Sequence, residues 1–158
     1  MTNVIEMMTS LYPVSDDTIQ LLKDNVTLCH FPKKYQLIKA NQYSRSAYFI
    51  EKGMTRQFYY KYDKDLTEHI AYEGGLVICL ESYLKQEPTR LMIESLEPVI
   101  LWELYKEDFE RLALEHADIG LLYRKFFEGS LIESQIKADT LRFEPAHERY
   151  NKLLHLHP

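Results

Sequence analysis

Histidine and cysteine are the residues best suited to hold a metal ion, so their spacing is considered first. They are His30, His69, His116, His147, His155 and His157, with Cys29 and Cys79. A metal site needs several such side chains, or carboxylates, to converge in space. Cupin-type sites place two histidines one residue apart on a strand, whereas His30 and His69 are isolated and His155-x-His157 stands in a terminal segment. An iron–sulfur cluster needs about four cysteines. We therefore predict no metal site, and a cupin-type metal-binding protein is the alternative.

No residue pattern in the chain predicts covalent catalysis. The sequence contains neither a Gly-x-Ser-x-Gly nucleophile elbow nor a glycine-rich phosphate loop. Ser44 and Ser46 flank Arg45 in a segment that is more simply a polar loop. Asp16 and Asp17 are paired carboxylates, but they stand at the start of a predicted helix, where they interact favourably with the helix dipole. We therefore expect a binding protein rather than an enzyme.

The length and composition indicate one globular domain. The chain has 158 residues, of which 46% are apolar, and this is enough for a sizeable core. Its net charge of -5 gives no counterion-release affinity for DNA, so this chain alone should bind DNA poorly. It lacks a signal-peptide pattern at the N-terminus and any run of roughly 20 apolar residues that could span a membrane. We expect a cytoplasmic protein without a membrane contact, with both cysteines reduced.

The middle of the chain consists of short apolar or alternating runs separated by turn residues, which predicts strands. Before residue 25 and after residue 105 the apolar spacing is helical instead. Strands are predicted at 26–31, 35–39, 47–51, 54–62, 66–72, 76–80, 90–96 and 98–105. Asp63-Lys64-Asp65 is the predicted turn of one hairpin. Many short strands with frequent turns favour an α+β, mainly β fold: an antiparallel β-roll (a jelly-roll-like double-stranded β-helix) with helices at both ends.

A long helix is predicted at 117–143, because this segment contains no proline and has apolar residues at helical spacing. One stripe contains Ile119, Leu122, Phe126, Ile132, Ile136 and Phe143, and a second apolar face contains Leu121, Phe127, Leu131 and Leu141. One face can pack on the strands, and the other needs a partner, for which a second copy of the same helix is the simplest choice. We predict a homodimer whose interface contains Leu122, Phe126, Ile132 and Ile136.

Several residue strings resemble the sensor domain of the Crp/Fnr family of transcription regulators, and most closely the divergent branch common in Bacteroidetes-type bacteria. YFIEKGMTR at 48–56 is similar to the family's strand–glycine–strand step. ESYL at 81–84, PTR at 88–90 and IESLE at 93–97 resemble the region around the family's phosphate-binding segment. ERYNKLL at 148–154 is similar to the first helix after the dimerisation helix. In order and spacing, the strings follow the family over nearly the whole chain.

The resemblance implies a cyclic-nucleotide-binding-type β-roll, a dimer formed through the long helix, and a C-terminal helix-turn-helix that binds DNA. It assigns residues 1–144 to the sensor domain, including the dimerisation helix at about 117–143. Residues 145–158 would begin the DNA-binding domain, most of which is absent from this sequence. We expect the chain to be part of a longer protein whose missing part contacts DNA.

The resemblance also implies where a ligand would bind, and here the sequence departs from the family pattern. The family binds the cyclic-nucleotide phosphate and ribose with a Gly-Glu pair and an Arg-Ser or Arg-Thr pair. LVICL follows Gly74-Gly75 without a Gly-Glu pair, and Thr89 stands at the arginine position with Arg90 one residue later. A shift of one residue along a strand turns a side chain to the opposite face. The candidate ligand-binding residues are Glu81, Ser82, Thr89 and Arg90, together with Ser134 and Gln135 where the family's helix closes over the base.

These observations predict the sensor and dimerisation domain of a Crp/Fnr-type regulator with a degenerate cyclic-nucleotide pocket and no cofactor. An unknown small-molecule effector would act by favouring one arrangement of the paired helices. A dimerising scaffold without any ligand is an alternative, in which case the six polar residues only line the surface or a pocket.

Overall fold

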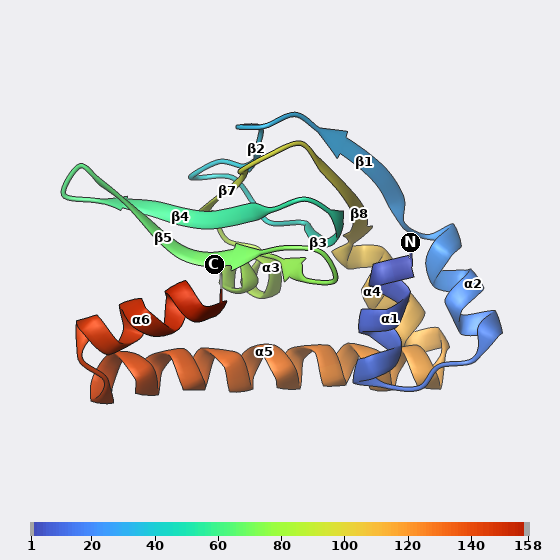
Figure 1. Ribbon diagram of the computed structural model, residues 1–158. Coiled ribbons are helices and arrows are strands. Elements are labelled where there is room, and N and C mark those ends of the chain that lie inside the picture. The colour runs from blue at the N-terminus through green and yellow to red at the C-terminus, as the bar shows by residue number, and fades with distance from the viewer. Residues whose placement is uncertain (1, 157–158) are drawn as a thin grey trace.

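The computed structural model describes residues 2–156, which form six helices and eight strands (Figure 1). The helices are α1 (Thr2–Leu11), α2 (Asp16–Asp24), α3 (Leu80–Lys85), α4 (Lys106–Glu115), α5 (Ala117–Phe143) and α6 (Ala146–Leu156). The strands are β1 (Thr27–Phe31), β2 (Gln36–Ile38), β3 (Ser46–Lys52), β4 (Thr55–Lys61), β5 (Lys64–Ala71), β6 (Leu76–Val77), β7 (Met92–Ser95) and β8 (Val99–Tyr105). The predicted division into helical ends and a strand-rich middle is confirmed.

Two four-stranded antiparallel sheets form the β-roll. Their strand orders are β1-β8-β3-β6 and β2-β7-β4-β5, so each sheet combines strands from distant parts of the sequence. Apolar side chains from both sheets form one core: Ile38, Ile50, Ala71, Val77, Cys79, Ile93, Val99 and Leu101. The predicted antiparallel β-roll with flanking helices is therefore confirmed.

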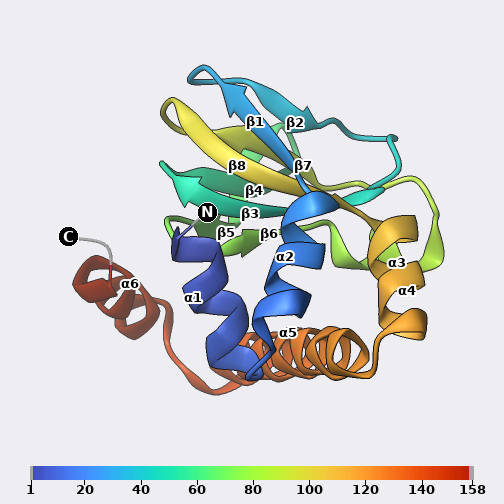
Figure 2. The ribbon, with the colours of Figure 1, turned by 90° about the vertical axis from the view of Figure 1, so that its right-hand side faces the viewer.

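A second core lies where α1, α2 and α4 gather beside the N-terminal end of α5 (Figures 1 and 2). From α5 this core receives Ile119, Leu122 and Phe126, which are nearly inaccessible to solvent. The remainder of α5 continues along the underside of the roll (Figure 1). Along that part the large apolar side chains are exposed, and they are Leu131, Ile132, Ile136, Leu141 and Phe143. None of the helices within residues 2–156 is long and apolar enough to cross a membrane.

The segment after β6 differs from the prediction. The strand predicted for 76–80 ends at Val77, and the short helix α3 follows from Leu80, where no helix was predicted. Short apolar runs suit a strand or a buried helix equally well, so periodicity could not separate the two. The helix is favoured here by a tertiary contact, since the fully buried ring of Tyr83 packs 6.2 Å from that of Phe127 on α5.

The turns at the two ends of β4 use left-handed backbone conformations. Gly53 has φ +92°, and a Cβ at this position would lie 2.6 Å from the carbonyl oxygen of Pro98, so only glycine fits. Tyr62 and Asp63 have φ 52° and 58°, as in the two-residue turn that matches hairpin twist. Lys64, which was predicted to lie in the turn, therefore already begins β5.

Arg56 on β4 connects the two neighbouring strands of its sheet. Its Nε donates to Glu94 Oε1 on β7 at 2.7 Å, and its terminal nitrogens donate to both oxygens of Asp65 on β5 at 2.8 and 2.7 Å. The guanidinium also lies 4.2 Å from the ring centroid of Phe58. The hydrogen bonds with Asp65 are the largest cause of the raised pKa of Arg56. One planar cation thus joins β5, β4 and β7.

We predict that Arg56→Ala lowers the free energy of unfolding by about 2 kcal/mol, because two carboxylates lose a forked, partly buried partner. Arg56→Lys should restore little of this loss, since an ammonium cannot make two parallel pairs of hydrogen bonds. Urea denaturation monitored by the fluorescence of Trp102 measures both effects. Lys85→Ala, which removes the exposed pair with Glu81, is the control and should change stability little. Equal losses in the Arg56 and Lys85 variants would contradict the prediction.

Candidate functional site

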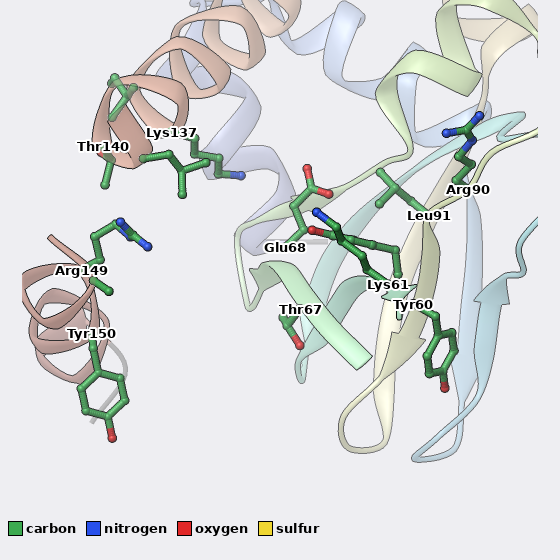
Figure 3. A pocket seen from close by; sticks show the side chains of 14 residues that line it. Tyr60, Lys61, Thr67, Glu68, Arg90, Leu91, Lys137, Thr140, Arg149 and Tyr150 are labelled. Atoms are coloured by element: carbon green, nitrogen blue, oxygen red, sulfur yellow. The ribbon is translucent and has the colours of Figure 1, made fainter. Parts of the chain in front are cut away.

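Three cavities meet around Leu91, where β4 and β5 approach α3 and α5. The largest, which we call the groove, has about 1100 Å³ and lies between the β4–β5 hairpin and α5–α6 (Figure 3). The cassette cavity, about 390 Å³, is lined by α3 and residues 87–91. The helix cavity, about 400 Å³, is lined by β5, α3 and α5. A ligand in the groove or in the helix cavity would contact both the sheet and the long helix, whereas the cassette cavity is lined by neither.

Ser82 and Thr89 are two of the predicted ligand-binding residues. Both are buried, and both form hydrogen bonds with backbone groups around the cassette cavity. The Ser82 hydroxyl donates to the carbonyl oxygen of Glu87 at 2.5 Å and accepts the N–H of Ser44 at 2.9 Å. Thr89 Oγ1 accepts the N–H of Leu91 at 2.9 Å. The two residues are 3% and 6% exposed. Both hydroxyls therefore help to fix the path of the chain after α3, with Ser82 as donor and acceptor and Thr89 as acceptor.

Arg90 and two carboxylates determine the charge of the cassette cavity. Arg90 is exposed and points toward α3 (Figure 3), and it forms no hydrogen bond or ion pair with the residues that the structure describes. Glu81 and Glu87 line the same cavity. Lys85 lies 2.7 Å from Glu81 and lowers the pKa of its carboxyl, which stays ionised at neutral pH. Glu81 is paired with Lys85, and Glu87 balances the charge of Arg90, so the lining offers no excess of positive charge to an anionic ligand.

Cys79 lies at the inner wall of the cassette cavity. Burial raises the pKa of its thiol to about 11, so the sulfur stays protonated at neutral pH and is a poor nucleophile. Burial also raises the pKa of Cys29. Both cysteines are free thiols, as predicted.

The long helix presents Ser134, but not Gln135, to a cavity. Ser134 lines the helix cavity together with Glu133 and Lys137. Gln135 lines none of the three cavities and donates to Asp139 Oδ1 at 3.2 Å on the exposed surface of the helix. Adjacent side chains on a helix point about 100° apart, so Ser134 faces the cavity while Gln135 faces the exposed surface.

The predicted dimer contacts fall into two groups. Leu122 and Phe126 are only 2% and 6% exposed, and the ring of Phe126 lies 6.3 Å from that of Phe49. They belong to the core of their own subunit, so the prediction that they contact a second copy is revised: a side chain buried in one subunit offers no surface to another. Ile132 and Ile136, in contrast, are each 60% exposed.

No group of three or more histidine, cysteine or carboxylate side chains within residues 2–156 is placed to hold a metal ion. His30 and His69 lie on β1 and β5, which belong to different sheets. His157, which forms the sequence pair with His155, lies outside the described residues.

Most residues that line the helix cavity were not predicted from the sequence, among them Gln57, Glu68, Leu91 and Lys137. Gln57 and Glu68 lie on strands where polar and apolar residues alternate as in any half-exposed sheet. Lys137 resembles an ordinary surface lysine. Only the approach of β5 to α5, about 70 residues apart in sequence, brings them together.

No family model matches the sequence, and no curated protein matches it. Solved structures do match the fold. A cyclic nucleotide-binding domain from Methylobacillus flagellatus KT has a TM-score of 0.76 at 12% identity, covering 90% of this chain and 81% of that one. The catabolite activator protein of Thermus thermophilus matches with a TM-score of 0.70 and 17% identity. The match covers 85% of this chain but only 63% of that protein. A CooA variant from Carboxydothermus hydrogenoformans matches with a TM-score of 0.64 and 18% identity, covering 91% of this chain and 92% of that one. The chain therefore has the cyclic nucleotide-binding fold of Crp/Fnr-type regulators, as the resemblance implied.

We predict that Ser82→Ala lowers the free energy of unfolding by about 1–3 kcal/mol, because the buried N–H of Ser44 loses its acceptor. Hydrogen exchange should become faster at residues 82–89, since the hydroxyl also holds the carbonyl of Glu87. Ser134→Ala on the exposed part of α5 is the matched control and should leave both measurements almost unchanged. A stable Ser82→Ala protein with native exchange in this segment would contradict the structural role.

Proposed function

We propose that this chain is the ligand-sensing and dimerisation domain of a Crp/Fnr-type transcription regulator, and that it is a binding module rather than an enzyme. The observation that carries the proposal is that the helix cavity is lined on one side by β5 and α3 and on the other by α5. An occupant of this cavity contacts the sheet and the long helix at once. It can therefore favour one position of the helix over another.

In this proposal the dimer forms through exposed apolar side chains of α5, one of which, Ile136, also lines the groove beside the β4–β5 hairpin. Ile132, Ile136 and Phe143 follow Gly129 at steps of three, four and seven residues, which is the spacing of a coiled-coil seam. The three side chains are 60%, 60% and 78% exposed, and a Cβ at Gly129 would meet nothing within 4 Å. A second copy of the same seam, related by a two-fold axis, covers these residues and lets the helices approach closely at the glycine.

Ligand and partner act on the same turns of one helix. Glu133 and Lys137 line the helix cavity, and the neighbouring residues Ile132 and Ile136 lie on the exposed seam. A small rotation or shift of α5 that accommodates a ligand therefore moves the seam as well. This is the physical link between occupancy and dimer geometry in the proposal.

Cyclic nucleotide is not the favoured ligand. Its phosphate would meet Glu81 and Glu87 in the cassette cavity, where Arg90 is the cation of the lining. The Ser82 hydroxyl already donates to the carbonyl oxygen of Glu87. Burying a phosphate there without further compensation is costly.

DNA recognition is assigned to a separate helix-turn-helix rather than to this domain. The chain carries a net charge of -5, which opposes binding to phosphates. Neighbours of the same fold include a catabolite activator protein and a transcription factor. In this proposal α6 belongs to the connection between the sensor and the DNA-binding part.

The double variant Ile132→Glu/Ile136→Glu should be monomeric, because four charges would be buried in each dimer seam. Sedimentation velocity compares it with the unmodified chain, which should be a dimer, and circular dichroism checks that the fold is retained. Leu114→Glu is the matched control, since Leu114 is 90% exposed on α4 and lies off the seam. A dimer that survives the double substitution would rule out this interface.

Calorimetric titration with cyclic AMP and cyclic GMP should show no micromolar binding, for the electrostatic reason given above. The cAMP-bound regulatory domain of Toxoplasma gondii PKA, a structure of the same fold, serves as the positive control. Micromolar affinity in this chain would show that the cassette cavity is a working nucleotide site and would overturn this part of the proposal.

A further inference from the structure

The groove between the β4–β5 hairpin and α5–α6 is the largest of the three cavities, and Arg90 is the one predicted ligand-binding residue that lines it. Its volume of about 1100 Å³ is enough for a drug-sized ligand. Part of its wall is aliphatic, with Leu91 before β7, Ile136 and Leu141 on α5, and Ala146 on α6. These side chains offer an apolar surface to a hydrocarbon chain.

The charged lining of the groove has a surplus of one positive charge. It consists of Lys61, Glu68, Arg90, Lys137 and Arg149. Lys137 is neutralised by Glu133, 3.2 Å away, and Arg90 is balanced by Glu87 in the cassette cavity. Lys61 and Arg149 then face one carboxylate. A single anionic head group would neutralise the remaining charge.

Arg149 differs from the other cations of the C-terminal helices. Within the described residues, the seven other lysines and arginines of α4, α5 and α6 each form an ion pair with a carboxylate. Arg149 forms none there, and its one hydrogen bond within the same residues runs from a terminal nitrogen to the carbonyl oxygen of Glu144 at 2.8 Å. Its side chain is half-buried and extends from α6 into the space beside it (Figure 3). Since a guanidinium carries five N–H donors in a fork, most of them are left for a ligand.

Lys61 adds positive potential from the opposite wall of the groove. It is the last residue of β4, is exposed, and forms no ion pair with the residues that the structure describes. Its ammonium lies 5.7 Å from the ring centroid of Tyr62. An anion in the groove is therefore attracted from the sheet as well as from α6.

We propose that the groove binds an aliphatic carboxylate, an anion with one charge and an alkyl chain. Arg149 forms a forked pair of hydrogen bonds with the carboxylate, and the alkyl chain lies against Leu91, Leu141 and Ala146. The single surplus charge suits a carboxylate better than a phosphomonoester, which carries close to two negative charges.

This site is separate from the helix cavity, so the inference goes beyond the sensor function proposed above. A bound carboxylate connects α6 to α5 and to the sheet, because all three line the groove. Only the consequence for DNA recognition rests on the proposed function, in which α6 leads to the DNA-binding part.

Calorimetric titration of the 158-residue chain with hexanoate, octanoate and decanoate, below their micelle concentrations and at constant ionic strength, tests the inference. Affinity should rise about fourfold with each added methylene, because each buries further apolar surface. 1-Octanol and octylamine have the same alkyl chain without the negative charge, and each should bind about tenfold more weakly than octanoate.

Arg149→Gln should weaken octanoate binding about tenfold through loss of the charged fork, and should leave the affinity for 1-octanol unchanged. Lys61→Gln, which is remote from the turn between α5 and α6, should weaken octanoate binding about two- to threefold. Circular dichroism checks that both variants are folded. Arg142→Gln is the matched control, because Arg142 lines none of the three cavities, and it should change neither affinity.

The inference is overturned if octanoate does not bind, if 1-octanol binds as tightly as octanoate, or if Arg142→Gln loses as much affinity as Arg149→Gln. Sedimentation velocity of the same samples reports the dimer independently. A failed carboxylate site and a failed dimerisation proposal therefore give different results.

Discussion

Burial of the N-terminal third of α5 is the constraint on which the rest of this structure depends. Ile119, Leu122 and Phe126 pack with α1, α4 and β3 in a core of their own. A helix fixed at one end in this way has a set direction. Its remaining 17 residues (127 to 143) extend roughly 25 Å along the roll at 1.5 Å per residue. The position of that segment beside β5 creates the helix cavity.

The exposed part of α5 carries two kinds of side chain, which helical periodicity sets apart. Glu133 and Lys137 line the helix cavity beside β5, whereas Ile132 lines none of the three cavities and Ile136 lines the groove. In the proposal above, the cavity-lining side chains of α5 contact a ligand and its exposed apolar side chains contact a second helix.

The cassette cavity belongs to a fold shared with cyclic nucleotide-binding domains, but our proposal does not assign it a cyclic nucleotide. The hydroxyls of Ser82 and Thr89 satisfy backbone groups of the loop after α3. Charge then decides which ligands remain possible: Arg90 is opposed by Glu81 and Glu87, and the adjacent helix cavity carries further carboxylates. The fold alone, which the chain shares with cyclic nucleotide-binding domains at 12–18% identity, does not fix the ligand.

The sequence by itself determined the order of nearly all elements and the limits of some, because alternation, helical spacing and turn residues act over a few neighbours. It placed α5 at its observed bounds and β8 within one residue. It did not predict α3, whose helical form depends on packing Tyr83 beside Phe127. Nor could it tell which part of the apolar stripe of α5 is buried, since Phe126 and Ile136 belong to one stripe and only Phe126 is covered by the core. The cavity-lining set Gln57, Glu68 and Lys137 was likewise decided by tertiary structure, because strands and helix far apart in sequence meet only when both cores have formed.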